Sequence, residues 1–123
     1  MQLLLEASAL ADDGTYRLIG LSDGTNTNRL YLGYSAASNT ITLLLDSGGV
    51  NQVVLNHAIS DITINTKMAF RYKENDFSLW VNGVKVNSQL GGSTYPVGTL
   101  TSLQFNSGAG SNNFYGKTKE VIY

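Results

Sequence analysis

Hydrophobic and polar side chains alternate along residues 68–73 and again along residues 77–82. The hydrophobic positions are Met68, Phe70, Tyr72, Phe77, Leu79 and Val81. Alternation with a period of two is typical of a β-strand that buries one face and leaves the other open. Asn82-Gly83 follows directly, and both residues accept the positive φ angles of a type I′ turn. The pattern therefore predicts two strands joined by a short loop, then a tight turn into a third strand.

Similar strand patterns recur along the whole chain, and no segment of ten or more residues shows the 3.6-residue period of an amphipathic helix. The predicted strands cover residues 3–9, 16–22, 29–35, 40–46, 52–56, 67–73, 77–81, 84–87, 102–106 and 113–122. Clusters of Gly, Asn, Asp and Ser separate them, as expected for turns. Many short strands with regular turns are typical of sandwiches and barrels. The predicted fold class is all-β, a two-sheet antiparallel jelly-roll sandwich.

The chain has 123 residues, the size of one domain, so residues 1–123 are predicted to form a single sandwich. A chain of this length buries roughly two thirds of its unfolded surface, which is enough for a two-layer core. Residues 3–5 begin directly in a predicted strand, and residues 121–123 stop in one. Because exposed apolar strand ends are uncommon in an intact protein, we expect a module excised from a longer one.

Amino-acid composition narrows the classes of function. The chain lacks cysteine, which excludes disulfides and thiolate metal sites. Eight Lys and Arg balance nine Asp and Glu, and the basic stripe of a nucleic-acid binder is not visible. No signal peptide opens the chain, and no segment approaches the roughly 20 apolar residues of a membrane span. Only 14% of residues are charged while Asn, Ser, Thr and Gly abound, which is typical of an extracellular or virion β domain.

The register of the first predicted hairpin places the only tryptophan of the chain on the open face. If residues 73–76 form a four-residue loop, Ala69 pairs with Trp80. The indole then lies over a small residue and diagonal to Arg71. Because the C–H face of a pyranose stacks on an indole while charged groups bind its hydroxyls, Trp80 and Arg71 are predicted to bind carbohydrate. The alternative is that a loop or a neighbouring domain covers Trp80.

Two further aromatic residues are candidates for carbohydrate binding. Tyr31 alternates with the apolar residues of its strand, so it would share the open face with Trp80 if that strand lies nearby. Tyr95 precedes the only proline within residues 89–99, the longest irregular segment, and binding residues often lie on such loops. The alternative for Tyr95 is a hydrophobic plug that closes one end of the sandwich. Phe114 is expected to pack in the core.

An oxygen-rich loop at residues 23–28 is the candidate metal site. Asp23, Asn26 and Asn28 offer the carboxylate and amide oxygens that calcium prefers. Only one carboxylate is present, and the same residues fit a plain Asx turn, which is the favoured interpretation. Residues 12–14 are a second candidate of the same kind. Calcium is therefore a possible ligand, and no cofactor is predicted to be required.

Several motifs in a fixed order together resemble a known superfamily. They lie at residues 22–30, 48–49, 67–84, 96–98, 114–117 and 120–123. This order resembles the laminin-G/concanavalin A-like superfamily, closest to the lectin-like modules of bacteriophage tail and fibre proteins and to related carbohydrate-binding modules. The most specific part is the hairpin at residues 67–84 that leads into Asn82-Gly83. The resemblance implies a curved two-sheet jelly roll and glycan binding, with a polysaccharide or cell-surface glycan as partner.

Catalysis must be considered because the same jelly roll hosts glucanases, in which one strand carries the pattern Glu-x-Asp-x-x-Glu. The only approach in this chain begins at Glu74 and Asp76, and Leu79 replaces the third carboxylate. The other acidic residues of interest, Glu6, Asp46, Asp61 and Glu120, are isolated in the sequence, and His57 is a lone histidine. Glycosidases need two carboxyl groups at a defined separation. The sequence therefore predicts no enzyme.

Three functions remain open on the sequence alone. The favoured one is a non-catalytic carbohydrate-binding module of a phage tail or fibre protein, or of a secreted polysaccharide-active protein. The alternatives are a structural or assembly module of a viral fibre and a diverged glycoside hydrolase. The expected location is extracellular or in the virion, and the oligomeric state is left open.

Overall fold

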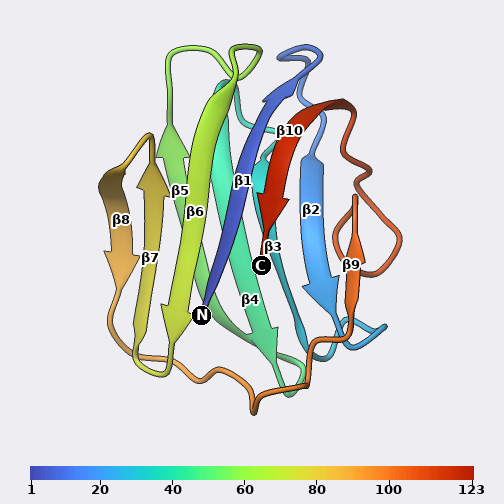
Figure 1. The fold of residues 1–123 in the computed structure, drawn as a ribbon, viewed down its shortest axis with the longest axis vertical. Coiled ribbons are helices and arrows are strands. Elements are labelled where there is room, and N and C mark those ends of the chain that lie inside the picture. Colours follow the sequence, from blue (N-terminus) through green and yellow to red (C-terminus); the bar gives the residue numbers. More distant parts are fainter.

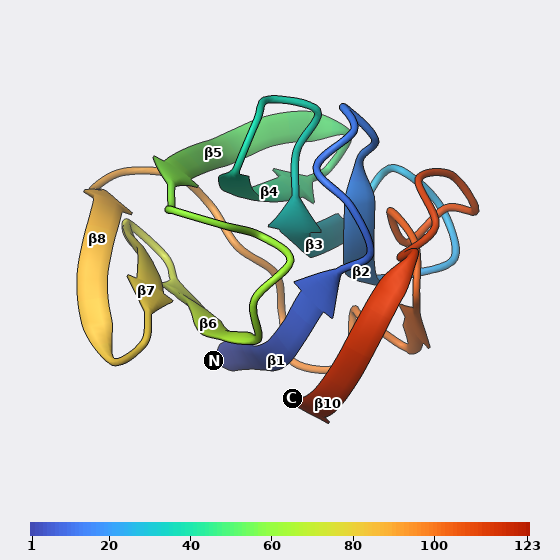
Figure 2. The same ribbon diagram turned by 90° about the horizontal axis from the view of Figure 1, so that it is seen from above.

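The computed structural model describes residues 1–123 as two five-stranded antiparallel sheets packed face to face (Figures 1 and 2). Sheet A has the strand order β10-β1-β6-β7-β8, and sheet B has the order β5-β4-β3-β2-β9. The strands are β1 (Gln2–Ala9), β2 (Arg17–Ser22), β3 (Arg29–Tyr34), β4 (Thr40–Ser47), β5 (Val50–Ala58), β6 (Thr66–Lys73), β7 (Asp76–Val81), β8 (Val84–Gln89), β9 (Ser102–Gln104) and β10 (Gly116–Ile122). The predicted jelly-roll sandwich is confirmed. The chain forms no helix, so none has the length and apolarity that a membrane crossing requires.

The two hairpins around β7 have the predicted register. Ala69 of β6 is the Cα partner of Trp80, as expected from the alternation of the two strands. The turn between β6 and β7 is shorter than predicted, because residues 73 and 76 pair with each other and only two residues separate them. Asn82 and Gly83 have φ angles of 50° and 84°, which are those of a type I′ turn. This geometry fixes which side chains of β6, β7 and β8 share the outer face of sheet A.

The core lies between the sheets and follows the alternation of each strand. A single cluster of 21 buried residues joins both inner faces, and its largest side chains are Tyr34, Phe70 and Phe77. Tyr34 donates a hydrogen bond from its hydroxyl to the carbonyl oxygen of Ala7 across the core, at 3.1 Å. Phe114 is half-buried and packs on Tyr34 with ring centres 6.1 Å apart, so its expected place against the core is confirmed.

The last two strands are shorter than predicted because residues 105–115 form a loop instead of strand. This loop lies on the outer face of sheet B, over Gly20 of β2. A Cβ atom at Gly20 would lie only 2.5 Å from the backbone nitrogen of Gly108. Gly108 itself has a φ of 89°, a conformation that other residues rarely adopt. The loop therefore covers one end of sheet B, while the outer face of sheet A stays open.

Candidate functional site

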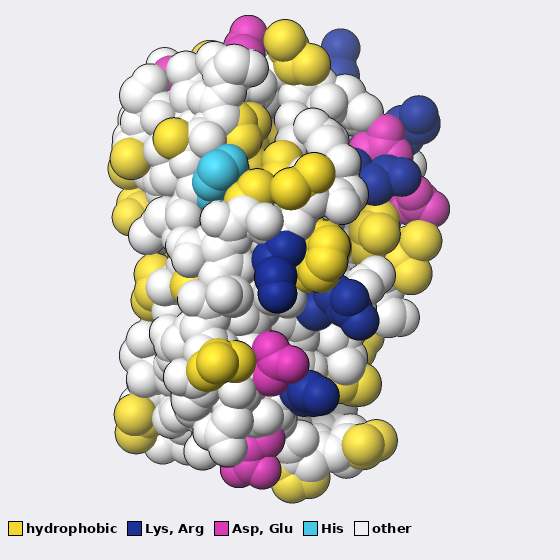
Figure 3. All heavy atoms as spheres, turned by 90° about the vertical axis from the view of Figure 1, so that its left-hand side faces the viewer, with side chains coloured by type: hydrophobic (Ala, Val, Ile, Leu, Met, Phe, Trp, Pro, Cys, Tyr) yellow, Lys and Arg dark blue, Asp and Glu magenta, His cyan; other side chains and the backbone are white.

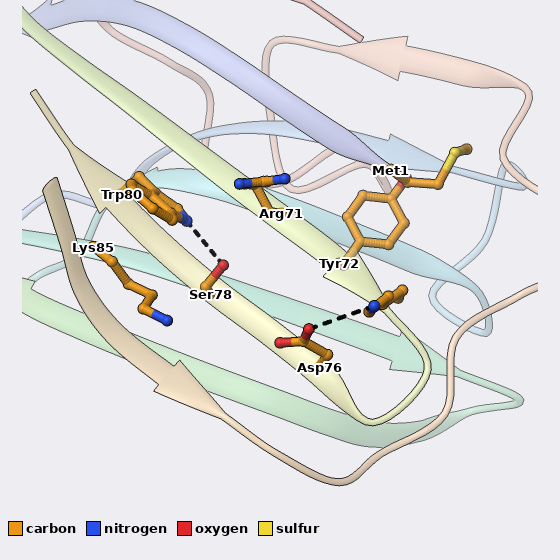
Figure 4. Close-up of a pocket in the computed structure, with 8 residues that line it drawn as sticks. Met1, Arg71, Tyr72, Asp76, Ser78, Trp80 and Lys85 are labelled. Atoms are coloured by element: carbon orange, nitrogen blue, oxygen red, sulfur yellow. Dashed lines mark hydrogen bonds and ion pairs between the residues drawn. The ribbon is translucent and has the colours of Figure 1, made fainter. Parts of the chain in front are cut away.

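Trp80 lies on the outer face of β7, as its register predicts. The neighbouring Leu79 and Val81 are buried in the core, whereas Trp80 is half-buried and faces out. Its cross-strand partner Ala69 is small, so nothing from β6 covers the indole at that position. The indole Nε1 donates a hydrogen bond to Ser78 Oγ at 2.9 Å, which fixes the orientation of the ring (Figure 4). The ring is thus held in place and left partly accessible.

Two cationic side chains flank this indole. The guanidinium carbon of Arg71 lies 5.6 Å from the centre of the Trp80 ring, within the range of a cation–π contact. Lys85 of β8 is the cross-strand partner of Trp80 on the other side. Figure 4 shows Arg71 and Lys85 on either side of the Trp80–Ser78 pair. The structure therefore brings the predicted pair Trp80 and Arg71 together.

Two open depressions adjoin the indole on the outer face of sheet A. The first has a volume of about 240 Å³ and is lined by Met1, Arg71, Tyr72, Lys73, Asp76, Ser78, Trp80 and Lys85. The second has a volume of about 190 Å³ and is lined by Gln2, Leu4, Lys67, Met68, Ala69, Arg71, Trp80 and Gly83. Trp80 and Arg71 border both depressions. An extended ligand that crosses this face would contact both residues.

Tyr31 does not share a face with Trp80, so that part of the prediction is wrong. It lies on β3, on the outer face of sheet B, and not on sheet A. The guanidinium carbon of Arg29 lies 5.6 Å from its ring centre, and Arg29 Nε forms an ion pair with Asp46 at 3.1 Å. Burial raises the pKa of the Tyr31 hydroxyl. Alternation shows on which side of its strand a residue lies, but it does not show to which sheet the strand belongs.

Tyr95 lies at one end of the sandwich, away from the indole. Its ring packs against the core, and its hydroxyl donates to the carbonyl oxygen of Arg29 at 2.7 Å. Burial raises the pKa of this hydroxyl. Tyr95 also lines a third depression of about 230 Å³, which Met1 and Tyr72 share with the first depression beside Trp80. These contacts fit the plug interpretation and give Tyr95 a structural part at this end.

The candidate calcium loop has the hydrogen bonds of an Asx turn. Asp23 Oδ1 accepts from the backbone nitrogen and the hydroxyl of Thr25, at 2.9 and 2.6 Å. Asp23 Oδ2 accepts from the Asn28 amide at 3.0 Å, and Asn26 is exposed. The hydrogen bonds from Thr25 and then Asn28 lower the pKa of Asp23. Both carboxylate oxygens are thus occupied by donors of the chain itself.

Two carboxylates that are isolated in the sequence become neighbours in sheet A. Glu6 of β1 and Glu120 of β10 are Cα partners, which corrects their description as isolated. Glu6 Oε2 accepts from the Asn65 amide at 2.6 Å and lies 3.5 Å from Lys119 Nζ. The Asn65 hydrogen bond, followed by the charge of Lys119, lowers the pKa of Glu6. A glycosidase acid needs a raised pKa, so this carboxylate is tuned in the opposite direction.

Three residues around the indole were not singled out from the sequence: Ser78, Lys85 and Lys67. The sequence nevertheless contains patterns that place Lys85 and Lys67 beside the indole. Once Asn82-Gly83 closes a two-residue hairpin, the position after Val84 must lie across from Trp80, which selects Lys85. Lys67 and Arg71 lie two positions on either side of Ala69, so strand alternation puts both on the outer face.

Solved structures share this fold over nearly the whole chain. The chain is similar to the CBM40 of the Ruminococcus gnavus IT-sialidase bound to α2,3-sialyllactose, with 13% identity and a TM-score of 0.72, covering 98% of this chain and 74% of that chain. It is also similar to domains LG4-5 of the mouse laminin α1 chain, with 10% identity and a TM-score of 0.63, covering 98% and 34% of the two chains. Xenopus laevis galectin-Ib has 14% identity and a TM-score of 0.55, covering 98% and 88%.

These similarities show the fold, a jelly-roll sandwich that the chain shares with a carbohydrate-binding module, laminin LG domains and a galectin, as the resemblance in the sequence implied. No protein-family model matches the chain, and no curated protein sequence matches it. Since a fold hosts many functions, the case for a particular function depends on the site itself.

Proposed function

We propose that this chain is a non-catalytic carbohydrate-binding module that binds a polymeric glycan on the outer face of sheet A. The observation that carries the proposal is Trp80, whose indole is partly exposed, fixed by Ser78 and flanked by Arg71 between two depressions. A pyranose ring stacks its C–H face on the indole, while Arg71 and the polar groups of the depressions bind hydroxyls. A ring that is already ordered loses little conformational entropy when the sugar binds.

The structural relatives support glycan binding as the class of function. One of them, the CBM40 of the IT-sialidase, is bound to sialyllactose, and others are a second carbohydrate-binding module and a galectin. We further propose that the module belongs to a phage tail or fibre protein, or to a secreted polysaccharide-active protein, and acts outside the cell or on the virion. The flanking gene sequence tests this context, since fibre repeats or a glycoside hydrolase domain would distinguish the two parents.

The carboxylates support a module without catalysis. Glu6 and Glu120 are neighbours, yet Asn65 and Lys119 hold Glu6 in its charged form. A reducing-end assay with catalytic amounts of protein checks this part of the proposal. Release of new reducing ends that disappears in Glu6→Gln would show a hydrolase instead.

The central experiment compares Trp80→Ala with the parent on a broad glycan array and by affinity electrophoresis in polysaccharide gels. We expect binding to at least one polymeric glycan, weakened roughly tenfold or more by Trp80→Ala because the stacking surface is lost. The control is Tyr115→Ala, since Tyr115 is 55% exposed in the loop before β10 and lies on neither depression. Thermal melts confirm folding. Binding that Trp80→Ala leaves unchanged would contradict the proposal.

An assembly module of a fibre is the second candidate, favoured by one observation. Leu4, Ala69 and Trp80 form a cross-strand row with Ile122, which is 49% exposed, so apolar side chains cross four strands of sheet A. Size-exclusion chromatography with light scattering separates the two candidates. A stable oligomer in which the emission of Trp80 is shielded from a soluble quencher would favour assembly over glycan binding.

A further inference from the structure

The charges of this chain are distributed unequally between the two sheets. Six of the eight Lys and Arg lie on strands of sheet A: Lys67, Arg71, Lys73, Lys85, Lys117 and Lys119. Sheet A strands carry only three acidic residues, Glu6, Asp76 and Glu120. The view from the side of β8 shows this difference, because the dark blue Lys and Arg side chains lie at the centre and right while the left edge carries none (Figure 3). A near-neutral chain therefore presents a cationic face.

The three cations next to the indole form no ion pair, although Glu6 is the cross-strand Cα partner of Lys67. Of the other five cations, four are paired and Lys117 is not: Arg17 pairs with Asp13, Arg29 with Asp46, Lys119 with Glu6 and, more loosely at 3.8 Å, Lys73 with Asp76. No carboxylate lies within 4.0 Å of Lys67, Arg71 or Lys85. Arg71 and Lys85 border the first depression, and Lys67 and Arg71 border the second, which no acidic residue lines. The unpaired positive charge is therefore concentrated on both sides of Trp80.

The spacing of these cations matches a chain-like ligand. Lys67 and Arg71 lie four residues apart on β6, roughly 13 Å along the strand, with Ala69 and its partner Trp80 between them. Lys85 lies beyond the indole on the next strand. A sugar ring on Trp80 would thus have a cation before it, after it and beside it. Guanidinium groups bind carboxylate and sulfate oxygens with two parallel hydrogen bonds, and such charge-assisted bonds exceed neutral ones in strength.

We propose that the glycan is acidic: a polysaccharide whose rings carry carboxylate or sulfate groups. This inference rests on the proposed function, because it assigns a charge to the ligand of the same Trp80 site. One ring stacks on the indole, and its anionic groups and those of its neighbours pair with Arg71, Lys67 and Lys85. A single-stranded nucleic acid fits less well, since such sites stack several bases on several aromatic residues and this face offers one indole.

The test uses pairs of polymers that differ only in charge. Polygalacturonate is compared with its methyl-esterified form, and dextran sulfate with dextran, by affinity electrophoresis and calorimetry. At least one acidic polymer is expected to bind about tenfold or more tightly than its neutral partner, and about 0.5 M NaCl should weaken that binding. The carboxylate and sulfate arms distinguish the two kinds of anionic group. Poly(dT) of similar charge serves as the competing polyanion.

Substitutions of the cations distinguish the proposal of an acidic glycan from the proposed function, glycan binding at Trp80. Arg71→Gln and the double variant Lys67→Gln/Lys85→Gln should each lower affinity for the acidic polymer about tenfold and affinity for its neutral partner much less, because glutamine loses the charge but keeps an amide that can bind hydroxyls. Lys117→Gln is the matched control, because Lys117 is equally exposed but lies on β10, away from the indole. If acidic and neutral polymers bind equally well and only Trp80→Ala weakens binding, the proposal of an acidic glycan is wrong and the proposed glycan-binding function stands. Poly(dT) binding as tight as the glycan, or binding to no glycan, would overturn both.

Discussion

At the scale of single residues, the site depends on how the indole of Trp80 is held. Ser78 lies two positions before it on β7, is 8% exposed, and accepts the indole hydrogen bond at 2.9 Å. A side chain that is free to rotate must be ordered when the ligand binds, at a cost of about 0.5–1.5 kcal/mol. Ser78 therefore acts as a positioning residue for the stacking surface.

Replacing this serine should weaken glycan binding without unfolding the protein. Ser78→Ala removes the acceptor, so we expect affinity to fall roughly three- to tenfold because the indole is no longer fixed. Calorimetry measures the affinity, and near-ultraviolet circular dichroism reports the lost order of the ring. Ser88→Ala is the control, since Ser88 is the exposed cross-strand partner of Ser78. An unchanged affinity together with an unchanged aromatic spectrum would show that the hydrogen bond has no positioning role.

At the scale of secondary-structure elements, the loop of residues 105–115 depends on a close approach to β2. Gly20 allows it, because a Cβ there would lie 2.5 Å from Gly108 N and 2.8 Å from Asn106 O. These are backbone atoms and cannot rotate away as a side chain would. The loop would have to lift from the sheet to admit even one methyl group.

Gly20→Ala should therefore destabilise the fold. We expect a loss of about 1–3 kcal/mol in the free energy of unfolding, as for other overpacked sites. Urea unfolding at neutral pH measures it. Val54→Ala serves as the control on the same outer face of sheet B, because Val54 is 46% exposed and should lose less than about 1 kcal/mol. Equal losses in the two variants would mean that the loop does not rest on β2 as described.

Sequence patterns predicted the elements well and their assembly less well. Period-two alternation and Asn82-Gly83 led to all ten strands and to the pairing of Ala69 with Trp80, because register within a hairpin is a local property. Which sheet a strand joins depends on contacts with residues far away in the sequence, so it is not a local property. Tyr31 was expected to share a face with Trp80 if its strand lay nearby, whereas β3 lies in sheet B. Glu6 and Glu120 are adjacent for the same reason, since chain ends far apart in sequence pair in sheet A.

At the scale of the whole molecule, the buried tyrosines couple stability to alkaline pH. Burial raises the pKa of Tyr34 from 10.0 to about 12, and it also raises the pKa of Tyr31, Tyr72 and Tyr95. A raised pKa in the folded state means that the unfolded chain releases its proton first. Between about pH 10 and about pH 12 the unfolded state thus binds fewer protons, so the free energy of unfolding falls as pH rises.

Tyr34 shows how large this loss of stability should be for a single tyrosine. It is fully buried in the core, and its hydroxyl donates a hydrogen bond to the Ala7 carbonyl oxygen. The contribution of Tyr34 to the free energy of unfolding is fully present below about pH 10. It declines by at most about 1.4 kcal/mol per pH unit as pH rises toward 12. Tyr34→Phe should cost about 1 kcal/mol near pH 8, because a hydrogen bond is lost, but should lose less stability than the parent between about pH 10 and pH 12.

Urea unfolding at a series of pH values measures the free energy of unfolding near pH 8 and its loss at alkaline pH, for the parent and the variant. Tyr16→Phe is the matched control, because it makes the same substitution at a side chain that is 40% exposed and lies outside the core cluster. The two curves for Tyr34→Phe and the parent should converge as pH rises, since only the parent buries the Tyr34 hydroxyl, which the unfolded chain ionises readily. Parallel curves would mean that the hydroxyl of Tyr34 ionises equally well in both states, which would contradict a core closed to water at the centre of the two sheets.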